Sequence, residues 1–344
     1  MKKTKIQWCH STVNPVMGCD GCELWPGKAQ VVAGIHNEIE LSSSLSGEPL
    51  RSVIRRALDN RQMSDIYGDR KLVANEIASV FNLSDRVRQK VVDVVRQNAK
   101  CYAGLLSSFR AGHNGYADKF ESPKLYPGRL ADAAKWGPPT EMEIADKPWL
   151  IGFRRLIFVS DMGDALSKNI PFKYLHREII ENVSSPSGQR HIWLWLSKRP
   201  ARMAEFGEWL RDRGIVWPDN LVAMTTVTSQ RFASRIDELR RVPSKLKGLS
   251  FEPLFEEVNV GLDGIDWIIV GGGSDVLADP FHVEWALNLK DECKTKGIAF
   301  FLKQLGKAPC HVGKPLHLED AHGGDWSEWQ KEWRIRELPS AFRH

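Results

Sequence analysis

Residues 155–164 have the sequence RLIFVSDMGD, in which an apolar run typical of a buried strand ends in polar residues and glycine. The same pattern returns at five later places, which are residues 191–200, 221–229, 246–254, 267–274 and 298–306. Helical stretches separate these runs, at residues 173–182, 201–213, 232–240 and 284–296. Strands that alternate with helices predict right-handed βαβ units and a parallel sheet.

At least six such units, counting a first strand expected near Ile6–Trp8, predict an α/β fold built as a full or partial parallel (β/α) barrel. In each unit the polar or glycine residues come directly after the strand. In such barrels these positions form the carboxyl face, where active sites are built. The pattern therefore predicts where a site would be before any family is considered.

Composition excludes several classes of protein. Of the 344 residues, 42% are hydrophobic and 26% are charged, which is typical of globular proteins rather than disordered or fibrous ones. No run of eighteen apolar residues occurs, so we expect no transmembrane helix and no membrane partner. Basic residues at the N-terminus are not followed by an apolar core, so we expect no secretory signal and a cytoplasmic location.

The net charge of +5 is concentrated in one segment, because residues 51–100 contain eleven Lys or Arg and only six Asp or Glu. The wider segment 23–100 has helical patterns, including Leu50–Arg61, Val73–Phe81 and a helix capped by Ser84. Residues 76–85 have the rhythm of a helix-turn-helix. The charge fits either a polyanion such as DNA or a solvated surface, and the helices fit a lid as well as a DNA-reading element.

Three cysteines form a candidate metal or cluster site. Cys19 and Cys22 form a CxxC pair on a loop, which can chelate one metal ion or two corners of a cluster. Cys101 comes at the end of the helical segment. If that segment is compact, bringing Cys101 back to the loop of Cys19 and Cys22 costs little loop-closure entropy. Structural zinc, with Cys9 or His10 as a fourth ligand, is an alternative, as is a redox CxxC.

The ordered motifs resemble the phage gene-product thirty-seven/sixty-eight family, also called three-cysteine-motif proteins. The resemblance covers most of residues 1–22 and 101–308. It rests on the strings IQW at 6–8, NPVMGC at 14–19, CYA at 101–103, VSDM at 159–162, LSKRP at 196–200, SFEPL at 250–254, VGGGS at 270–274 and FFLKQ at 300–304. Members resemble radical S-adenosylmethionine (SAM) enzymes and are distantly similar to spore photoproduct lyase.

The resemblance implies a barrel of radical SAM type with a helical insertion. We expect four segments: residues 1–22 with the first strand and cluster loop, 23–100 as the basic helical insertion, 101–308 as the (β/α) barrel, and 309–344 as a C-terminal extension. Two departures stand out. The usual CxxxCxxC spacing is replaced by 78 residues between the second and third cysteines, and the Gly-Gly-Glu that often holds SAM is not evident.

The resemblance also implies cofactors and their ligands. Cys19, Cys22 and Cys101 would hold a 4Fe–4S cluster, SAM would bind the fourth iron, and Tyr102 would pack beside the cluster. The carboxylates of Asp161 and Asp164 would bind the ribose hydroxyls or amino group of SAM, with helix capping as the alternative. Further cofactor-binding candidates are Thr226, Gly271 and Gly272, and the glycines could equally form a tight turn.

Glu252 and Lys198 are the candidate catalytic residues. Glu252 follows a strand and precedes a proline, and its alternative role is a salt bridge to Lys198 or Lys303. Lys198 and Arg199 could bind a carboxylate or a phosphate.

The expected function is that of a radical SAM enzyme, isomerase or lyase-like, acting on nucleic acid. DNA base hypermodification, for example isomerisation of a modified thymidine, and DNA repair are both open. The resemblance further implies an external electron donor such as flavodoxin or ferredoxin, and the host cytoplasm if the protein is phage-encoded. The alternatives are a zinc-containing nucleic-acid-binding protein without radical chemistry, and radical chemistry on a peptide or small molecule.

Overall fold

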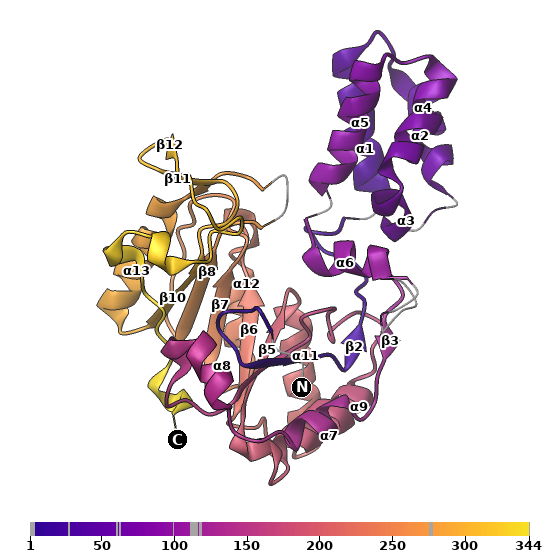
Figure 1. Cartoon of the computed structure of the whole chain (residues 1–344). Coiled ribbons are helices and arrows are strands. Elements are labelled where there is room, and N and C mark those ends of the chain that lie inside the picture. The colour runs from indigo at the N-terminus through magenta and orange to yellow at the C-terminus, as the bar shows by residue number, and fades with distance from the viewer. Residues whose placement is uncertain are drawn as a thin grey trace. The chain divides into compact units, whose positions relative to one another are not determined.

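The computed structural model describes residues 4–26, 28–59, 61, 63–98, 100–110, 116, 119–274 and 278–343. The chain divides into two compact units (Figure 1). Unit 1 consists of residues 1–15, 126–161 and 168–344, and unit 2 consists of residues 16–125 and 162–167. The loop with the CxxC pair and residues 101–125 therefore belong to the same unit as the helical segment.

Unit 1 is built on a seven-stranded sheet in which every neighbouring pair is parallel. In spatial order its strands are β1 (Ser11–Val13), β4 (Leu156–Val159), β5 (Ile192–Ser197), β6 (Leu221–Thr226), β7 (Lys247–Phe251), β8 (Trp267–Gly271) and β10 (Ala299–Gln304). The sheet curls into a half-barrel with helices along it (Figure 1). The α/β class is confirmed, and the barrel is a partial one.

Helices of unit 1 connect successive strands. They are α7 (Arg129–Ala134), α8 (Glu141–Asp146), α9 (Phe172–Leu175), α10 (Glu181–Ser184), α11 (Pro200–Arg211), α12 (Arg235–Arg240) and α13 (Val283–Lys296). A π-helical turn at His176–Ile180 joins α9 to α10, so the helix expected at 173–182 is present as three short pieces. A second sheet has the order β12 (Lys314–Pro315), β11 (Pro309–His311), β9 (Phe281–His282).

The prediction of a first strand near Ile6–Trp8 is wrong, because β1 begins at Ser11. The physical reason is Lys147, whose buried ammonium donates to the carbonyl oxygens of Thr4 at 3.0 Å, Ile6 at 2.6 Å and Cys9 at 2.7 Å. A backbone whose carbonyls converge on one cation cannot extend as a strand.

The segment before β1 instead packs inside the curl. The Trp8 ring lies 4.6 Å from the ring of Phe158 on β4 and 6.0 Å from that of Trp267 on β8. Leu338 and Phe342 from the C-terminal end of the chain belong to the same buried cluster. Both ends of unit 1 thus help to fill the half-barrel.

The C-terminal segment covers the β10 edge of the sheet. The Leu302 N–H donates to the Ile335 carbonyl oxygen at 2.8 Å, and the Glu337 N–H donates to that of Phe300 at 2.9 Å. Between them Arg336 lies over the rings of Trp149 at 4.0 Å and Trp326 at 4.8 Å. Tryptophans near charges in this tail therefore have a structural role, which the sequence did not explain.

Unit 2 is mainly helical, with α1 (Lys28–Ser42), α2 (Gly47–Asp59), α3 (Met63–Gly68), α4 (Arg70–Phe81), α5 (Asp85–Asn98), α6 (Tyr102–Arg110) and an antiparallel pair of β2 (Val16–Met17) and β3 (Lys124–Leu125). Ser84 caps α5, since its Oγ accepts from the Val87 N–H at 3.4 Å. Asn82 ends α4 with a left-handed φ of 48°, which makes the tight turn between α4 and α5. Among the described helices, none is long and apolar enough to cross a membrane.

Candidate functional site

The backbone of unit 2 brings the third cysteine to the CxxC loop. Two backbone hydrogen bonds join Cys22 and Trp25. The Trp25 N–H donates to the Cys22 carbonyl oxygen at 2.9 Å, and the Cys22 N–H donates to the Trp25 carbonyl oxygen at 3.3 Å. Inside this turn the Leu24 carbonyl oxygen accepts from the Cys101 N–H at 2.9 Å. Cys101 is therefore bonded to the residue two positions after Cys22, although 78 residues lie between the two cysteines.

A tight loop holds Cys19. Its N–H donates to the Phe120 carbonyl oxygen at 2.7 Å. Gly18 has a left-handed φ of 93°, and a Cβ there would lie 2.5 Å from that same oxygen, so only glycine fits. A Cβ on Gly163 would in turn lie 2.5 Å from the Gly18 carbonyl oxygen. Close backbone approach on both sides fixes the loop that carries the first cysteine.

The indole of Trp25 joins the remaining parts of this site. It is buried, lies 4.4 Å from the Tyr67 ring and 5.3 Å from the Phe120 ring, and donates from Nε1 to Glu121 at 2.8 Å. A Cβ on Gly104 would lie 2.5 Å from the Trp25 ring. Because Gly104 is in α6, the helix that Cys101 precedes, the absent side chain lets the two cysteine segments pack together.

The thiols differ in exposure. No disulfide joins any of the six cysteines; Cys19 is buried, whereas Cys22 and Cys101 are partly exposed. Burial raises the pKa of Cys9 and of Cys293 to about 12, so both are neutral core thiols. In the described part of the chain, no three His, Cys, Asp or Glu side chains are already arranged to hold an ion.

The zinc alternative named Cys9 or His10 as a fourth ligand, and both belong to the buried part of unit 1. The Nδ1 atom of His10 accepts from the Leu156 N–H at 2.9 Å. Burial, with Arg155 and Lys147 nearby, lowers the pKa of His10 to about 3. Both side chains therefore have structural roles.

Two predicted cofactor residues belong to unit 2 with the cysteines. Tyr102 is the first residue of α6 and 52% exposed. Asp164 is buried, and its Oδ1 accepts from the Leu166 N–H at 2.9 Å while its own N–H donates to the Gly18 carbonyl oxygen at 3.2 Å. Asp164 thus stabilises a turn beside the Cys19 loop, and no helix begins there for it to cap.

The other predicted site residues belong to unit 1, at the carboxyl edge of its sheet. Because the strands are parallel, their carboxyl ends meet at one edge. These residues are Asp161 after β4, Lys198 after β5, Thr226 at the end of β6, Glu252 after β7, and Gly271 and Gly272 at the end of β8.

Glu252 forms an ion pair with Lys303 of β10, and both side chains are mostly buried. This is one of the two salt bridges expected as its structural alternative. A Cβ on Gly271 would lie 3.4 Å from the Glu252 Cγ, so Glu252 packs directly against this glycine. At Gly272 a Cβ would lie 2.4 Å from the Leu305 carbonyl oxygen, so this glycine is required by packing within the protein.

Asp161 is held by the residue after β1. Its Oδ1 accepts from the Asn14 Nδ2 at 2.5 Å. Burial raises the pKa of Asp161 above its usual value, although hydrogen bonds from Asn14 and Thr12 oppose the shift.

Ser160, which the sequence analysis missed, has a strained left-handed φ of 74°. Its buried hydroxyl has no hydrogen-bond partner within the described residues. An unpaired buried hydroxyl next to the partly buried Asp161 requires an explanation, and a bound polar group is one. No signal in the sequence marks this conformation.

Thr226 and Lys198 are positioned by the strand ends. The buried Thr226 offers its carbonyl oxygen to the Arg235 Nη1 at 3.0 Å. Lys198 stands between Ser197, the last residue of β5, and Arg199, whose N–H donates to the Ser197 Oγ at 3.0 Å. The Lys198 side chain is partly exposed.

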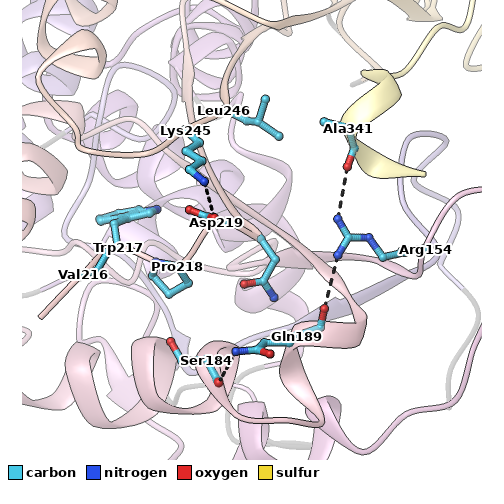
Figure 2. A pocket seen from close by; sticks show the side chains of 11 residues that line it. Arg154, Ser184, Gln189, Val216, Trp217, Pro218, Asp219, Lys245, Leu246 and Ala341 are labelled. Atoms are coloured by element: carbon cyan, nitrogen blue, oxygen red, sulfur yellow. Dashed lines mark hydrogen bonds and ion pairs between the residues drawn. The ribbon is translucent and has the colours of Figure 1, made fainter. Parts of the chain in front are cut away.

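A separate pocket of about 700 Å³ lies at the amino ends of the strands, and none of the predicted site residues lines it. Figure 2 shows Arg154 on one side, where its guanidinium donates to the carbonyl oxygens of Gln189 at 3.4 Å and Ala341 at 3.3 Å. On the other side Lys245 is paired with Asp219 (Figure 2). Its polar groups are thus largely engaged with the protein itself.

Comparison with known families decides the classification. A family model described as a protein of unknown function, DUF5131, matches residues 93–330. The chain belongs to the DUF5131 family. The DUF5131 match begins within α5, so it includes Cys101 and every predicted residue of the sheet edge but neither Cys19 nor Cys22. Neither the curated proteins nor the solved structures contain a match to this chain.

Proposed function

We propose that this protein is a radical SAM enzyme whose 4Fe–4S cluster is held by Cys19, Cys22 and Cys101. The observation that carries the proposal is the hydrogen bond from the Cys101 N–H to the Leu24 carbonyl oxygen. It returns the third cysteine to the loop of the first two. The partial β/α barrel, with polar residues after its strands, supports the same class of enzyme.

The donor set fits such a cluster. Thiolates are the protein ligands of iron–sulfur clusters, and three of them leave the fourth iron for SAM. Cys22 and Cys101 are partly exposed, so an incoming cluster can reach them. A bound and reduced cluster would supply the one electron needed to cleave SAM into methionine and a 5′-deoxyadenosyl radical, the species that would take hydrogen from the substrate.

Polar side chains of unit 1 would bind and orient the reacting molecules. Asp161 and Ser160 would contribute a carboxylate and a hydroxyl to polar recognition at the carboxyl edge of the unit 1 sheet. Because burial raises the pKa of Asp161, its carboxyl group is more readily protonated than an exposed one. The Lys303 ammonium orients the Glu252 carboxylate toward the substrate, and Lys198 supplies positive charge for a phosphate.

The substrate in this proposal is nucleic acid. Its supports are the basic residues of the segment 23–100 and the resemblance to a phage-type family, since phages hypermodify DNA bases. DNA base hypermodification, including isomerisation of a modified thymidine, and DNA repair are the two reactions proposed. An external flavodoxin or ferredoxin would supply electrons, in the cytoplasm of the cell or of the phage's host.

The test is metal analysis joined to SAM cleavage. The full chain is purified without oxygen, reconstituted, and assayed for iron, sulfide, zinc and, with dithionite and SAM, for 5′-deoxyadenosine. We expect about four irons and four sulfides per chain and formation of 5′-deoxyadenosine. Cys19→Ala, Cys22→Ala and Cys101→Ala should each lose both properties.

The matched control is Cys310→Ala, a partly exposed cysteine of unit 1, which should keep iron and activity. One zinc per chain without sulfide or SAM cleavage would overturn the proposal and favour a zinc-containing nucleic-acid-binding protein. Loss of iron in the Cys310 variant would show that the cluster ligands are assigned wrongly.

A further inference from the structure

Arginines stacked on aromatic rings recur at the carboxyl edge of the unit 1 sheet. Arg129 lies over the Tyr126 ring at 3.9 Å, and its Nη1 donates to the carbonyl oxygen of Asn14, the residue after β1, at 3.1 Å. Arg202, in the first turn of α11 after β5, lies over the Phe172 ring at 4.6 Å.

The third pair follows β6. Arg231 lies 5.5 Å from the centre of the Phe232 ring, and Arg235 lies over the same ring at 4.4 Å. Arg235 also donates to the carbonyl oxygen of Thr226, the last residue of β6, at 3.0 Å. We call Arg129, Arg202 and Arg231, with their aromatic partners, the arginine rim.

The rim follows the strand order β1, β4, β5, β6. Neighbouring strands are about 4.8 Å apart, so the strand ends from β1 to β6 span roughly 15 Å. That length equals about four nucleotide rises along one DNA strand, at about 3.4 Å each. A stacked guanidinium keeps its charge while it presents a flat face, which suits contact with phosphates and bases.

Acidic groups near the rim are already engaged. Glu178 accepts from the N–H groups of Gly128 and Leu130, at 2.8 and 3.0 Å, and Glu256 accepts from that of Gln230 at 2.8 Å. Glu252 is paired with Lys303. Within the described residues no carboxylate pairs with Arg129, Arg202 or Arg231, so their positive charge is not neutralised. Arg129 and Arg202 are partly exposed, and each donates to one backbone carbonyl oxygen, that of Asn14 at 3.1 Å and that of Ile170 at 2.8 Å.

The basic segment of unit 2 differs, because several of its cations are paired with carboxylates. Arg55 pairs with Glu48 at 3.0 Å, and Arg88 pairs with Asp85 at 2.8 Å. Lys90 likewise pairs with Glu38 at 2.8 Å. The concentration of Lys and Arg in residues 51–100 is thus a weaker guide to the DNA-binding surface than the sequence suggested.

We infer that the arginine rim of unit 1, rather than the basic helices of unit 2, binds the DNA phosphate backbone. The inference rests on the proposed function only for the choice of nucleic acid as partner. Its test is binding alone, so it can fail or succeed independently of the radical chemistry.

The experiment measures fluorescence anisotropy of a labelled 30-base-pair duplex with the reconstituted full chain between 50 and 200 mM salt. Three proteins are compared: wild type, the rim variant Arg129→Gln/Arg202→Gln/Arg231→Gln, and the helix variant Arg51→Gln/Arg56→Gln/Arg86→Gln. We expect the rim variant to bind at least about tenfold more weakly, with a salt slope smaller by about two to three. The helix variant should bind within about threefold of wild type.

A second rim variant, with lysine at the same three positions, separates charge from folding. It should retain most of the wild-type salt slope, whereas a purely structural role of the arginines would leave it as defective as the glutamine variant. Equal losses in the rim and helix variants, a larger loss in the helix variant, or no loss in the rim variant would each overturn the inference. SAM cleavage without DNA should be unchanged in the rim variants, which distinguishes this outcome from failure of the proposed function.

Discussion

At the scale of single residues, unit 1 contains polar side chains that are buried and satisfied by the backbone. The Lys147 ammonium donates hydrogen bonds to three carbonyl oxygens near the N-terminus. His10 accepts from the Leu156 N–H, and Arg155 pairs with Glu143 at 2.8 Å. Such groups cost desolvation energy, so removing a partner leaves an unsatisfied buried group and destabilises the fold.

His10 predicts a pH dependence of stability. Its pKa in the folded protein is about 3, compared with 6.5 when exposed, so the unfolded chain binds the extra proton as pH falls. Its contribution is complete above pH 6.5 and is lost progressively toward pH 3. Between pH 6.5 and 5 the loss is about 2 kcal/mol. Glu143 contributes little between pH 6.5 and 5, because its stabilising effect is lost only as the pH falls from its unfolded value of 4.5 toward its folded pKa of about 2.

The measurement is urea unfolding at pH 7 and pH 5 for wild type and His10→Asn. Asparagine keeps an acceptor for the Leu156 N–H and cannot titrate. The variant should therefore lose about 2 kcal/mol less than wild type between the two pH values. Equal losses in both proteins would contradict the assignment of this pH dependence to His10.

At the scale of elements, the candidate cluster site depends on one helix packing against one loop. The indole of Trp25 occupies the space that a side chain at Gly104 would need. Glycine within a helix ordinarily costs about 1 kcal/mol relative to alanine, so its presence in α6 has a packing reason.

Gly104→Ala should therefore destabilise unit 2 by about 1–3 kcal/mol, opposite to the usual effect of alanine in a helix. It should also lower iron uptake, because it pushes the Cys101 segment away from the CxxC loop. Urea unfolding and iron analysis measure both effects. Gly137→Ala is the control, since a Cβ there has nothing within 4 Å. A Gly104 variant as stable as wild type would show that the contact is not needed.

The elements also show which parts of the fold can be predicted from short stretches of sequence. Six of the seven strands of the large sheet lie within the six segments predicted to contain them, because buried parallel strands are nearly continuous apolar runs. The exception is Ile6–Trp8, which looks like a strand in the sequence. There the Lys147 ammonium donates a hydrogen bond to the Ile6 carbonyl oxygen. No local pattern reveals a partner about 140 residues away.

At the scale of the whole molecule, an open half-barrel has edges that need protection. Glu337 covers β10 twice, through its N–H to the Phe300 carbonyl oxygen at 2.9 Å and through its carboxylate, which accepts from the Phe300 N–H at 3.2 Å. Exposed edge strands promote association between chains. The C-terminal segment therefore protects the sheet as well as filling its interior.

Glu337→Pro removes the N–H donor and the carboxylate acceptor together. We expect a loss of about 2 kcal/mol in stability and concentration-dependent association, measured by urea unfolding and by light scattering after size-exclusion chromatography. Glu337→Gln is the matched control, because it keeps the N–H and should remain close to wild type. A proline variant that stays as stable and as dispersed as wild type would argue against edge protection.

The candidate site was only partly accessible from sequence. The edge residues Asp161, Glu252 and Gly271 could be named because they directly follow strands, and parallel strands end at one edge. The strained φ of Ser160 could not be predicted, and only the structure showed that Glu252 pairs with Lys303, one of its two expected partners, because both features depend on neighbours distant in the chain.

The sequence by itself determined the α/β class, the strand order along the chain and the CxxC loop, because each follows from short-range periodicity or spacing. Only the tertiary structure decided that Cys101 returns to Leu24, that the barrel stays half open and that arginines stack along its edge. These features arise from contacts between distant segments, whose energies depend on the packing of the whole chain rather than on any local pattern.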